Sequence, residues 1–337
     1  MSTTNIAGNE NSKWRISEPA TFEATILTAA AKLGIQPLAV EKDYWVCEAL
    51  RAIEVTHPGQ VIFKGGTSLE KMMIIERFSE DLDLLVTSDF PNFYQAKKAM
   101  SEMCEAARDA TDGTLAHKDS GGEYGKAHKS MYLTIPVKNL PIKNSGMADP
   151  GQILLEFGQT GGSRPSNYRS VSSLISRSLT ESGFDVAVYE DLIPFRVQIL
   201  HPGRTLIEKL LRVNNFALME DANRDHHGWP RIGRQFYDLW KLLECPEVLV
   251  FLADKNHAIS VLDDCVRVSL DFTPDKLPPS GGFADSPIFD ASSELFERLS
   301  EEHDIAMERL YFGKPLDLPL IEVFARVKAN RNFLDFN

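Results

Sequence analysis

The amino-acid sequence predicts a mixed α/β protein with a helical C-terminal region. Short apolar runs typical of buried strands alternate with helical periodicity up to residue 200, and helical periodicity alone continues from Thr205. A hydrophobic content of 43% over 337 residues is enough for the core of one or two domains. The chain is therefore expected to be globular.

Helices are expected to come first along the chain. Residues 1–16 are expected to form a disordered tail. Its polar start, rich in Ser, Thr and Asn, lacks the basic and apolar regions of a signal peptide and is therefore not expected to be one. Ser17 is suited to cap a helix that begins near Pro19 and stops at Gly34. Apolar residues at helical spacing predict a second helix over residues 38–53.

Two short strands enclose the most informative segment. The apolar run at residues 61–63 ends at two glycines, which is typical of a buried strand followed by a tight turn. A helix is expected over residues 69–75, and the sequence DLDLLV at 81–86 then reads as a second strand. Since side chains alternate along a strand, Asp81 and Asp83 are expected on one face.

The remaining elements follow from the same patterns. Expected strands lie at 129–137, 152–157 and 195–199, a helix at 91–109, and loops at 161–166 and 273–287. Further helices are expected at 205–213, 236–243, 248–253, 258–268, 294–310 and 319–333. We therefore divide the chain into the tail, an α/β domain over residues 17–200, and a helical domain over residues 201–337 that completes a cleft.

Glycines beside paired carboxylates point to phosphate and metal chemistry. Gly65 and Gly66 allow backbone amides to approach a phosphate closely, and a helix starting just after them adds its positive end. Thr67 or Ser68 is placed to donate a hydroxyl hydrogen bond to the same phosphate.

The two acids that follow suit a hard cation. Asp81 and Asp83 can share Mg²⁺, which prefers oxygen ligands and bridges to substrate phosphates. Together with the glycine turn, they predict a site that transfers a nucleotidyl group from a nucleoside triphosphate, where the metal neutralises the triphosphate.

The segment FKGGTSLEKMMIIERFSEDLDLLV resembles the AbiEii/AbiGii-type nucleotidyltransferase toxins of the DNA polymerase β-like superfamily. Three further segments fit this family in order over residues 41–243: EKDYW at 41–45, TLIEKLL at 205–211 and RQFYDL at 234–239. The resemblance implies a polymerase β-like mixed sheet with flanking helices and a helical C-terminal region.

The resemblance also implies roles for individual residues. Asp81 and Asp83 would ligate Mg²⁺, Glu156 is a candidate third carboxylate that deprotonates the acceptor, Lys209 would hold the triphosphate, and Asp238 would orient Lys209 or approach the acceptor. The expected nucleotide-binding set is Lys64, Gly65, Gly66, Thr67, Ser68, Arg77 and Arg234. Lys42 and Asp43 are second-tier candidates near the site.

Each candidate also has an ordinary interpretation. A DxD pair arises by chance, two glycines can be a plain turn, and Glu156 or Lys209 can simply face solvent. Arg234 and Asp238, four residues apart, can be a helix ion pair worth about 0.3–0.5 kcal/mol. His226 and His227 fit a solvated loop better than a metal site.

For the biology, the resemblance implies a toxin of a bacterial toxin–antitoxin or phage-defence pair. Its acceptor would be RNA, with the 3′ end of tRNA as the expected site, and its antitoxin would be a separate protein. A small-molecule nucleotidyltransferase of the antibiotic-modifying type, or a catalytically silent binding module of the same fold, are the alternatives. A basic cleft would favour RNA, and a small acidic pocket would favour an aminoglycoside.

Composition limits the compartment and the partners. The net charge of −12 argues against a general nucleic-acid coat, so RNA contact requires a local basic patch. The four cysteines are too far apart for a CxxC pair and are expected to be free thiols in a reducing cytosol. No apolar stretch approaches the ~20 residues of a membrane helix. We expect a cytoplasmic protein without membrane association or recognition of DNA sequence.

Overall fold

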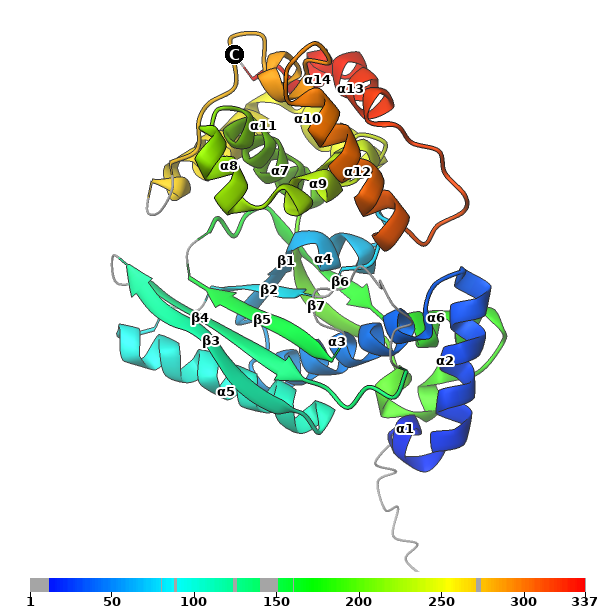
Figure 1. Ribbon diagram of the computed structural model, residues 1–337. Coiled ribbons are helices and arrows are strands. Elements are labelled where there is room, and N and C mark those ends of the chain that lie inside the picture. The colour runs from blue at the N-terminus through cyan, green and yellow to red at the C-terminus, as the bar shows by residue number, and fades with distance from the viewer. Residues whose placement is uncertain are drawn as a thin grey trace, which may run out of the picture.

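The computed structural model describes residues 12–79, 81–87, 90–123, 126–139, 151–159, 161–270 and 274–336. Residues 1–11 of the expected tail lie outside this part, and residues 14–16 of it belong to a short helix, α1 (Trp14–Ser17). Figure 1 shows a sheet with helices against one face and a second group of helices on the other side. None of the helices in the described residues combines the length and apolar character that a bilayer span requires.

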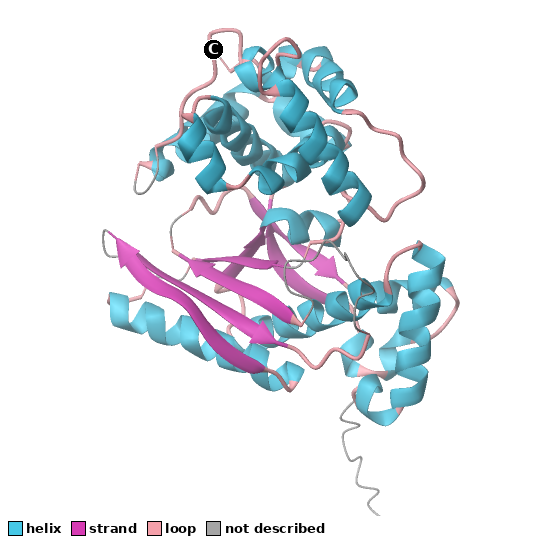
Figure 2. Ribbon diagram, viewed as in Figure 1, coloured by secondary structure: helices cyan, strands magenta, loops and turns pink. Residues whose placement is uncertain are grey.

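The strands, magenta in Figure 2, belong to one mixed sheet. This sheet has seven strands in the order β3-β4-β5-β2-β1-β7-β6. The strands are β1 (Val61–Lys64), β2 (Asp81–Val86), β3 (Thr114–Glu123), β4 (Lys126–Thr134), β5 (Gln152–Gly158), β6 (Ser166–Val171) and β7 (Phe195–Leu200). The pairs β1–β7 and β2–β5 are parallel and the other neighbours are antiparallel. The predicted mixed α/β fold is confirmed, with the strand expected at 129–137 shifted to Lys126–Thr134.

The elements missed from the sequence include the two edge strands, β3 and β6, and the short helices α1, α6 (Leu174–Glu181) and α8 (Asp221–His227). Edge strands have no neighbour on one side, and polar residues fill much of both, so neither shows the apolar run of a buried strand. The predicted loop at 161–166 ends where β6 begins.

One face of the sheet is covered by α3 (Pro37–Thr56) and α5 (Phe93–Thr111), which also pack against each other (Figure 1). Apolar residues from both helices and from alternate positions of the strands form the first hydrophobic core. Leu82 and Leu84 of β2 are buried in this core, and Asp81 and Asp83 are half-buried on the other face. The predicted alternation of DLDLLV therefore holds.

Helix α2 (Pro19–Leu33) begins with proline in its first turn and stops at Gly34, whose left-handed backbone (φ 70°) closes the helix as expected. The predicted cap, Ser17, instead ends α1, and Glu18 takes the N-cap position without a side-chain hydrogen bond. Ser17 is the last residue of the short helix α1, so it cannot cap α2. The local sequence does not reveal this preceding helix.

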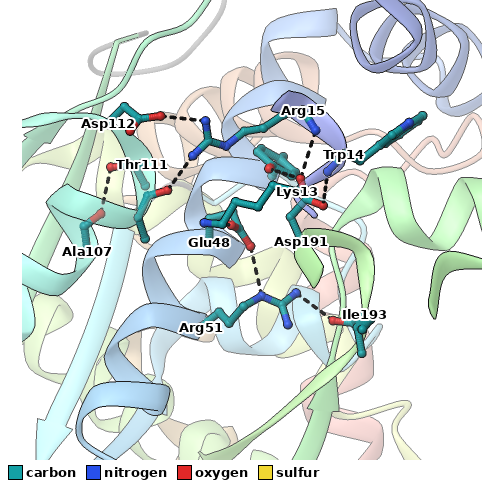
Figure 3. A network of polar contacts seen from close by, with 12 residues as sticks. Lys13, Trp14, Arg15, Glu48, Arg51, Ala107, Thr111, Asp112, Asp191 and Ile193 are labelled. Atoms are coloured by element: carbon teal, nitrogen blue, oxygen red, sulfur yellow. Dashed lines mark hydrogen bonds and ion pairs between the residues drawn. The ribbon is translucent and has the colours of Figure 1, made fainter. Parts of the chain in front are cut away.

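Buried Asp191 attaches α1 to the body of the molecule (Figure 3). Its carboxylate accepts hydrogen bonds from the Trp14 amide at 2.7 Å, the Arg15 amide at 3.2 Å and the Tyr44 hydroxyl at 2.6 Å. The Arg15 guanidinium also pairs with Asp112 at 2.7 Å. Because three donors share this buried carboxylate, its removal should lower the free energy of unfolding substantially.

From residue 202 onward the regular elements of the described chain are helices joined by loops. Its helices are α7 (Pro202–Ala217), α8 (Asp221–His227), α9 (Trp229–Leu242), α10 (Pro246–Ala253), α11 (Lys255–Ser269), α12 (Phe296–Leu310), α13 (Leu320–Ala329) and α14 (Arg331–Leu334). They enclose a second hydrophobic core, which Leu69 and Ile75 also join. Residues 226 and 227, expected in a loop, end α8, and their side chains lie outside the described part. The two-domain division stays a prediction.

Candidate active site

The glycine segment is the start of a helix and not the separate turn expected from sequence. Helix α4 (Gly65–Lys71) begins four residues earlier than the predicted helix and ends before Ile75. Gly65 has φ of +79°, and a Cβ there would lie 2.1 Å from Oδ2 of Asp83. A Cβ at Gly66 would lie 2.7 Å from Nη2 of Arg77. Glycine is therefore required so that a carboxylate and a guanidinium can lie against the backbone here.

Three carboxylates meet on the open face of the sheet. Lys64 of β1 is paired with Asp83 of β2, and Asp83 is paired with Glu156 of the parallel strand β5. Asp81 lies two residues before Asp83 on the same face. Burial raises the pKa of Glu156, and the adjacent Asp83 carboxylate raises it further. The structure thus brings the predicted third carboxylate beside the DxD pair.

The donor set fits magnesium better than zinc. Within the described residues, no group of three or more His, Cys, Asp or Glu side chains is arranged so that it could hold a metal ion by itself. Mg²⁺ does not need one, because one or two carboxylates usually hold it while water and substrate phosphates fill the other positions. Asp81 and Asp83 supply the oxygen ligands such an ion prefers.

A cavity of about 190 Å³ separates these carboxylates from α7 and α9. The predicted site residues along it are Lys64, Gly65, Gly66, Arg77, Asp81, Asp83, Lys209 and Arg234. The cavity is also lined by Ser79, Thr205, Glu208, Arg212 and Gln235, which sequence reasoning missed. Among the described residues, five cationic side chains face three acidic ones there, so the cavity is locally basic in an acidic protein.

A helical repeat is the signal that was available for several of the missed residues. Thr205, Glu208 and Arg212 follow one another at spacings of three and four residues, so they share one face of α7. Lys209 lies beside them on the same helix. Once Lys209 is a candidate, its helix neighbours are candidates as well.

Asp238 is fully buried and organises the cationic side of the cavity. Nε and Nη2 of Arg77 donate to its two oxygens at 2.5 and 2.6 Å, and Nζ of Lys209 lies 2.7 Å away. Burial alone would raise the pKa of Asp238, but Arg77 and Lys209 lower it to about 2. Of the two predicted roles, orienting Lys209 is the one that these contacts support.

The surroundings of Lys209 and Arg234 indicate a site for an anionic ligand. Burial lowers the pKa of Lys209, an effect that Asp238 opposes, and its Nζ also donates to Oε1 of Gln235 at 2.8 Å. Burial likewise lowers the pKa of Arg234, and the neighbouring Arg77 lowers it further. Nε of Arg234 and Oγ1 of Thr205 are buried without a hydrogen-bond partner in the described part of the chain. A bound anion would satisfy donors of this kind.

Thr67 and Ser68 do not reach the cavity. The Thr67 hydroxyl donates to the backbone carbonyl of Asp81 at 2.6 Å, and the Ser68 hydroxyl donates to the carbonyl of Gly65 at 2.8 Å. Both side chains are buried. The hydroxyls therefore hold the glycine segment against β2, and the predicted phosphate contact is not supported for either.

The EKD segment lies in a buried charge network away from the cavity. Asp43 of α3 pairs with Lys71, which also pairs with Glu70, and Glu70 pairs with Arg177 of α6. These contacts fasten α4 to α3 and α6. Lys42 is also fully buried. Neither Lys42 nor Asp43 lines the cavity, so their expected place near the site is not observed.

Comparison with known proteins gives one family. The family model described as "Nucleotidyl transferase AbiEii toxin, Type IV TA system" matches residues 48–325. No curated protein matches the chain.

Two solved structures from Helicobacter pylori are similar in part. One is described as a "putative nucleotidyltransferase", with 15% identity, 86% of this chain and 96% of that chain covered, and a TM-score of 0.35. The other is JHP933, with 13% identity, coverage of 84% and 94%, and a TM-score of 0.30.

Proposed function

Because this chain belongs to the AbiEii nucleotidyltransferase toxin family, we propose that it transfers a nucleotide from a nucleoside triphosphate to an RNA acceptor, with Mg²⁺ held by Asp81 and Asp83. The family match makes the protein a nucleotidyltransferase of a toxin–antitoxin system, which implies nucleotide use and an antitoxin partner. The metal, the RNA acceptor and the residue roles are the proposed part.

The observation that carries the proposal is the fit between Gly65 and Asp83. A Cβ at Gly65 would lie 2.1 Å from the Asp83 carboxylate, so backbone and acid share one small space at the edge of the cavity. A triphosphate tail bound there meets backbone amides on one side and the acids on the other. Bound Mg²⁺ would supply charge neutralisation at this point.

The cationic side chains of the cavity bind the triphosphate in this proposal. Lys64, Lys209, Arg212 and Arg234 line it and offer several donors to phosphate oxygens. Asp238 holds Lys209 in place through a 2.7 Å contact, so the ammonium is positioned before the substrate arrives. Catalysis of this kind depends mainly on positioning and charge compensation.

Glu156 is the proposed base. A hydroxyl of the acceptor attacks the α-phosphate, the new O–P bond forms as the bond to pyrophosphate breaks, and the hydroxyl proton passes to Glu156. The raised pKa of this carboxyl, caused by burial and by Asp83, suits a group that accepts a proton.

RNA is the acceptor that the charge distribution favours. Five lysine and arginine side chains and three acidic ones among the described residues line the cavity, which is an excess of positive charge in a chain that carries −12. A pocket for an aminoglycoside would need the opposite excess. We propose the 3′ end of tRNA as the acceptor, and a toxin role in the cytoplasm that a separate antitoxin relieves.

The test is label transfer to RNA. Total RNA is incubated with Mg²⁺ and each labelled triphosphate in turn, using the wild type, Asp81→Ala, and Asp221→Ala as a control. Asp221 is 89% exposed on α8, so its removal should change nothing. We expect labelling by the wild type and the control only, and growth arrest on expression that Asp81→Ala relieves. Equal labelling by Asp81→Ala would reject the proposal.

A further inference from the structure

The sheet face that carries the catalytic carboxylates continues outward onto β4 and β3. Cross-strand pairing produces two rows of neighbours on this face: Asp83–Glu156–Ser130–Asp119, and Asp81–Leu154–Tyr132–Ala116. Residues directly opposite each other point to the same side, and adjacent strands lie about 4.8 Å apart. Tyr132 is therefore roughly 10 Å from Asp81 along the sheet.

The other face of β3 and β4 is already occupied. Leu133 is buried in the first core and Met131 packs against it. Nζ of Lys129 donates to the hydroxyl of Ser101 on α5 at 3.0 Å. Figure 1 shows α5 lying along this side of β3 and β4. The core thus uses the odd-numbered positions of β4, and polar side chains and Tyr132 remain on the face that adjoins the carboxylates.

A β-bulge places a lysine on that same face. The pairing of His117 with Met131 is followed by that of Asp119 with Ser130, so Lys118 is an extra residue in β3. Bulges of this kind re-aim side chains and are common next to active sites. Nζ of Lys118 lies 3.5 Å from Oε1 of Glu156 and 5.6 Å from the centre of the Tyr132 ring. Its side chain is 32% exposed.

We propose that Tyr132 and Lys118 form a platform for the single-stranded 3′ end of the RNA acceptor, with a terminal base stacked on the Tyr132 ring and a backbone phosphate on Lys118. This inference rests on the proposed function, because it places the acceptor of that reaction. A base paired within a duplex cannot lie flat on the ring, whereas an unpaired terminal base can.

The platform adjoins the group that must deprotonate the acceptor. In the register of the sheet, Glu156 stands between Asp83 and Ser130, and its Lys118 contact connects it to the ring. A phosphate bound by Lys118 would therefore lie beside Glu156, next to the carboxylates of the proposed reaction.

The experiment separates RNA binding from triphosphate binding. Label-transfer rates are measured with RNA varied at saturating triphosphate and then the reverse, for the wild type, Tyr132→Ala, Tyr132→Phe and Tyr168→Ala. Tyr168 is a matched control, because it lies on β6, at the other end of the sheet, and is 46% exposed. It also has a cation near its ring, since Arg196 lies 5.5 Å from the ring centre. Tyr132→Ala should raise the KM for RNA about tenfold and leave the KM for triphosphate unchanged. Tyr132→Phe and Tyr168→Ala should match the wild type.

A second variant covers the case in which Tyr132→Ala fails to fold, as judged by urea denaturation. Lys118→Gln should raise the KM for RNA. It should also reduce the slope of log KM for RNA against log salt concentration by about one unit. A wild-type enzyme that labels no RNA would overturn the proposed function itself. A labelling wild type, with an unchanged KM for RNA in Tyr132→Ala and Lys118→Gln, would overturn only the platform. A raised KM for triphosphate in Tyr132→Ala would also overturn it, because the ring would then hold the incoming base.

Discussion

Replacing Asp238 with asparagine should cost the protein much of its stability at neutral pH. The carboxylate is fully buried and receives Arg77 at 2.5 and 2.6 Å and Lys209 at 2.7 Å. An amide of similar size leaves two buried cations without their counter-charge. Breaking a buried ion pair from one side usually costs about 3–5 kcal/mol, so we expect a loss of about 3 kcal/mol in the free energy of unfolding.

The pH dependence of that loss follows from the pKa of Asp238. Its depression from 3.8 to about 2 corresponds to about 2 kcal/mol. Because the pKa is lower in the folded state, this contribution is fully present above 3.8 and disappears as the pH falls through about 2. The difference between wild type and Asp238→Asn should therefore shrink on acidification.

Urea denaturation from pH 7 down to the lowest pH at which the wild type folds measures this difference. Asp221→Asn serves as the control, because its exposed ion pair with Arg224 should contribute less than about 0.5 kcal/mol. An Asp238→Asn protein as stable as the wild type at pH 7, or a deficit that stays constant on acidification, would refute the reasoning.

Other perturbations test single contacts. Gly65→Ala should reduce label transfer at least about 100-fold, since the added Cβ would lie 2.1 Å from Asp83, and a fully active variant would contradict the close fit. Glu156→Gln should lower kcat by about 100-fold or more with the KM for triphosphate unchanged, as loss of a general base predicts, and an unaltered kcat would remove Glu156 from that role. Asp191→Ala should lower the free energy of unfolding by about 3 kcal/mol because three donors lose their acceptor, and an unchanged urea midpoint would show that α1 is held by other means.

The sequence predicted β2 and its two acids because the burial of one strand face and the polarity of the other are both recorded within six consecutive residues. One face of DLDLLV meets the core and the other meets the cavity, so alternation is preserved in the sequence itself. The edge strands β3 and β6 escaped prediction for the opposite reason, since neither is apolar enough to mark a buried strand.

The start of α4 was misplaced because glycine is a poor helix former and a frequent turn residue. In the structure Gly65 has to be glycine because Asp83, a residue of strand β2, lies against it. Arg77 and Asp238 are 161 residues apart, so no local pattern reveals their pairing. The helix spacing of Arg234 and Asp238 suggested a local ion pair, but Asp238 takes the bidentate Arg77 and Lys209 instead.

Calorimetric titration of nucleoside triphosphate tests the central claim most directly, using the wild type and Asp83→Asn with and without Mg²⁺. We predict tight binding by the wild type only when Mg²⁺ is present, and loss of that metal-dependent binding in Asp83→Asn. Binding of triphosphate and Mg²⁺ by Asp83→Asn with wild-type affinity would contradict the account.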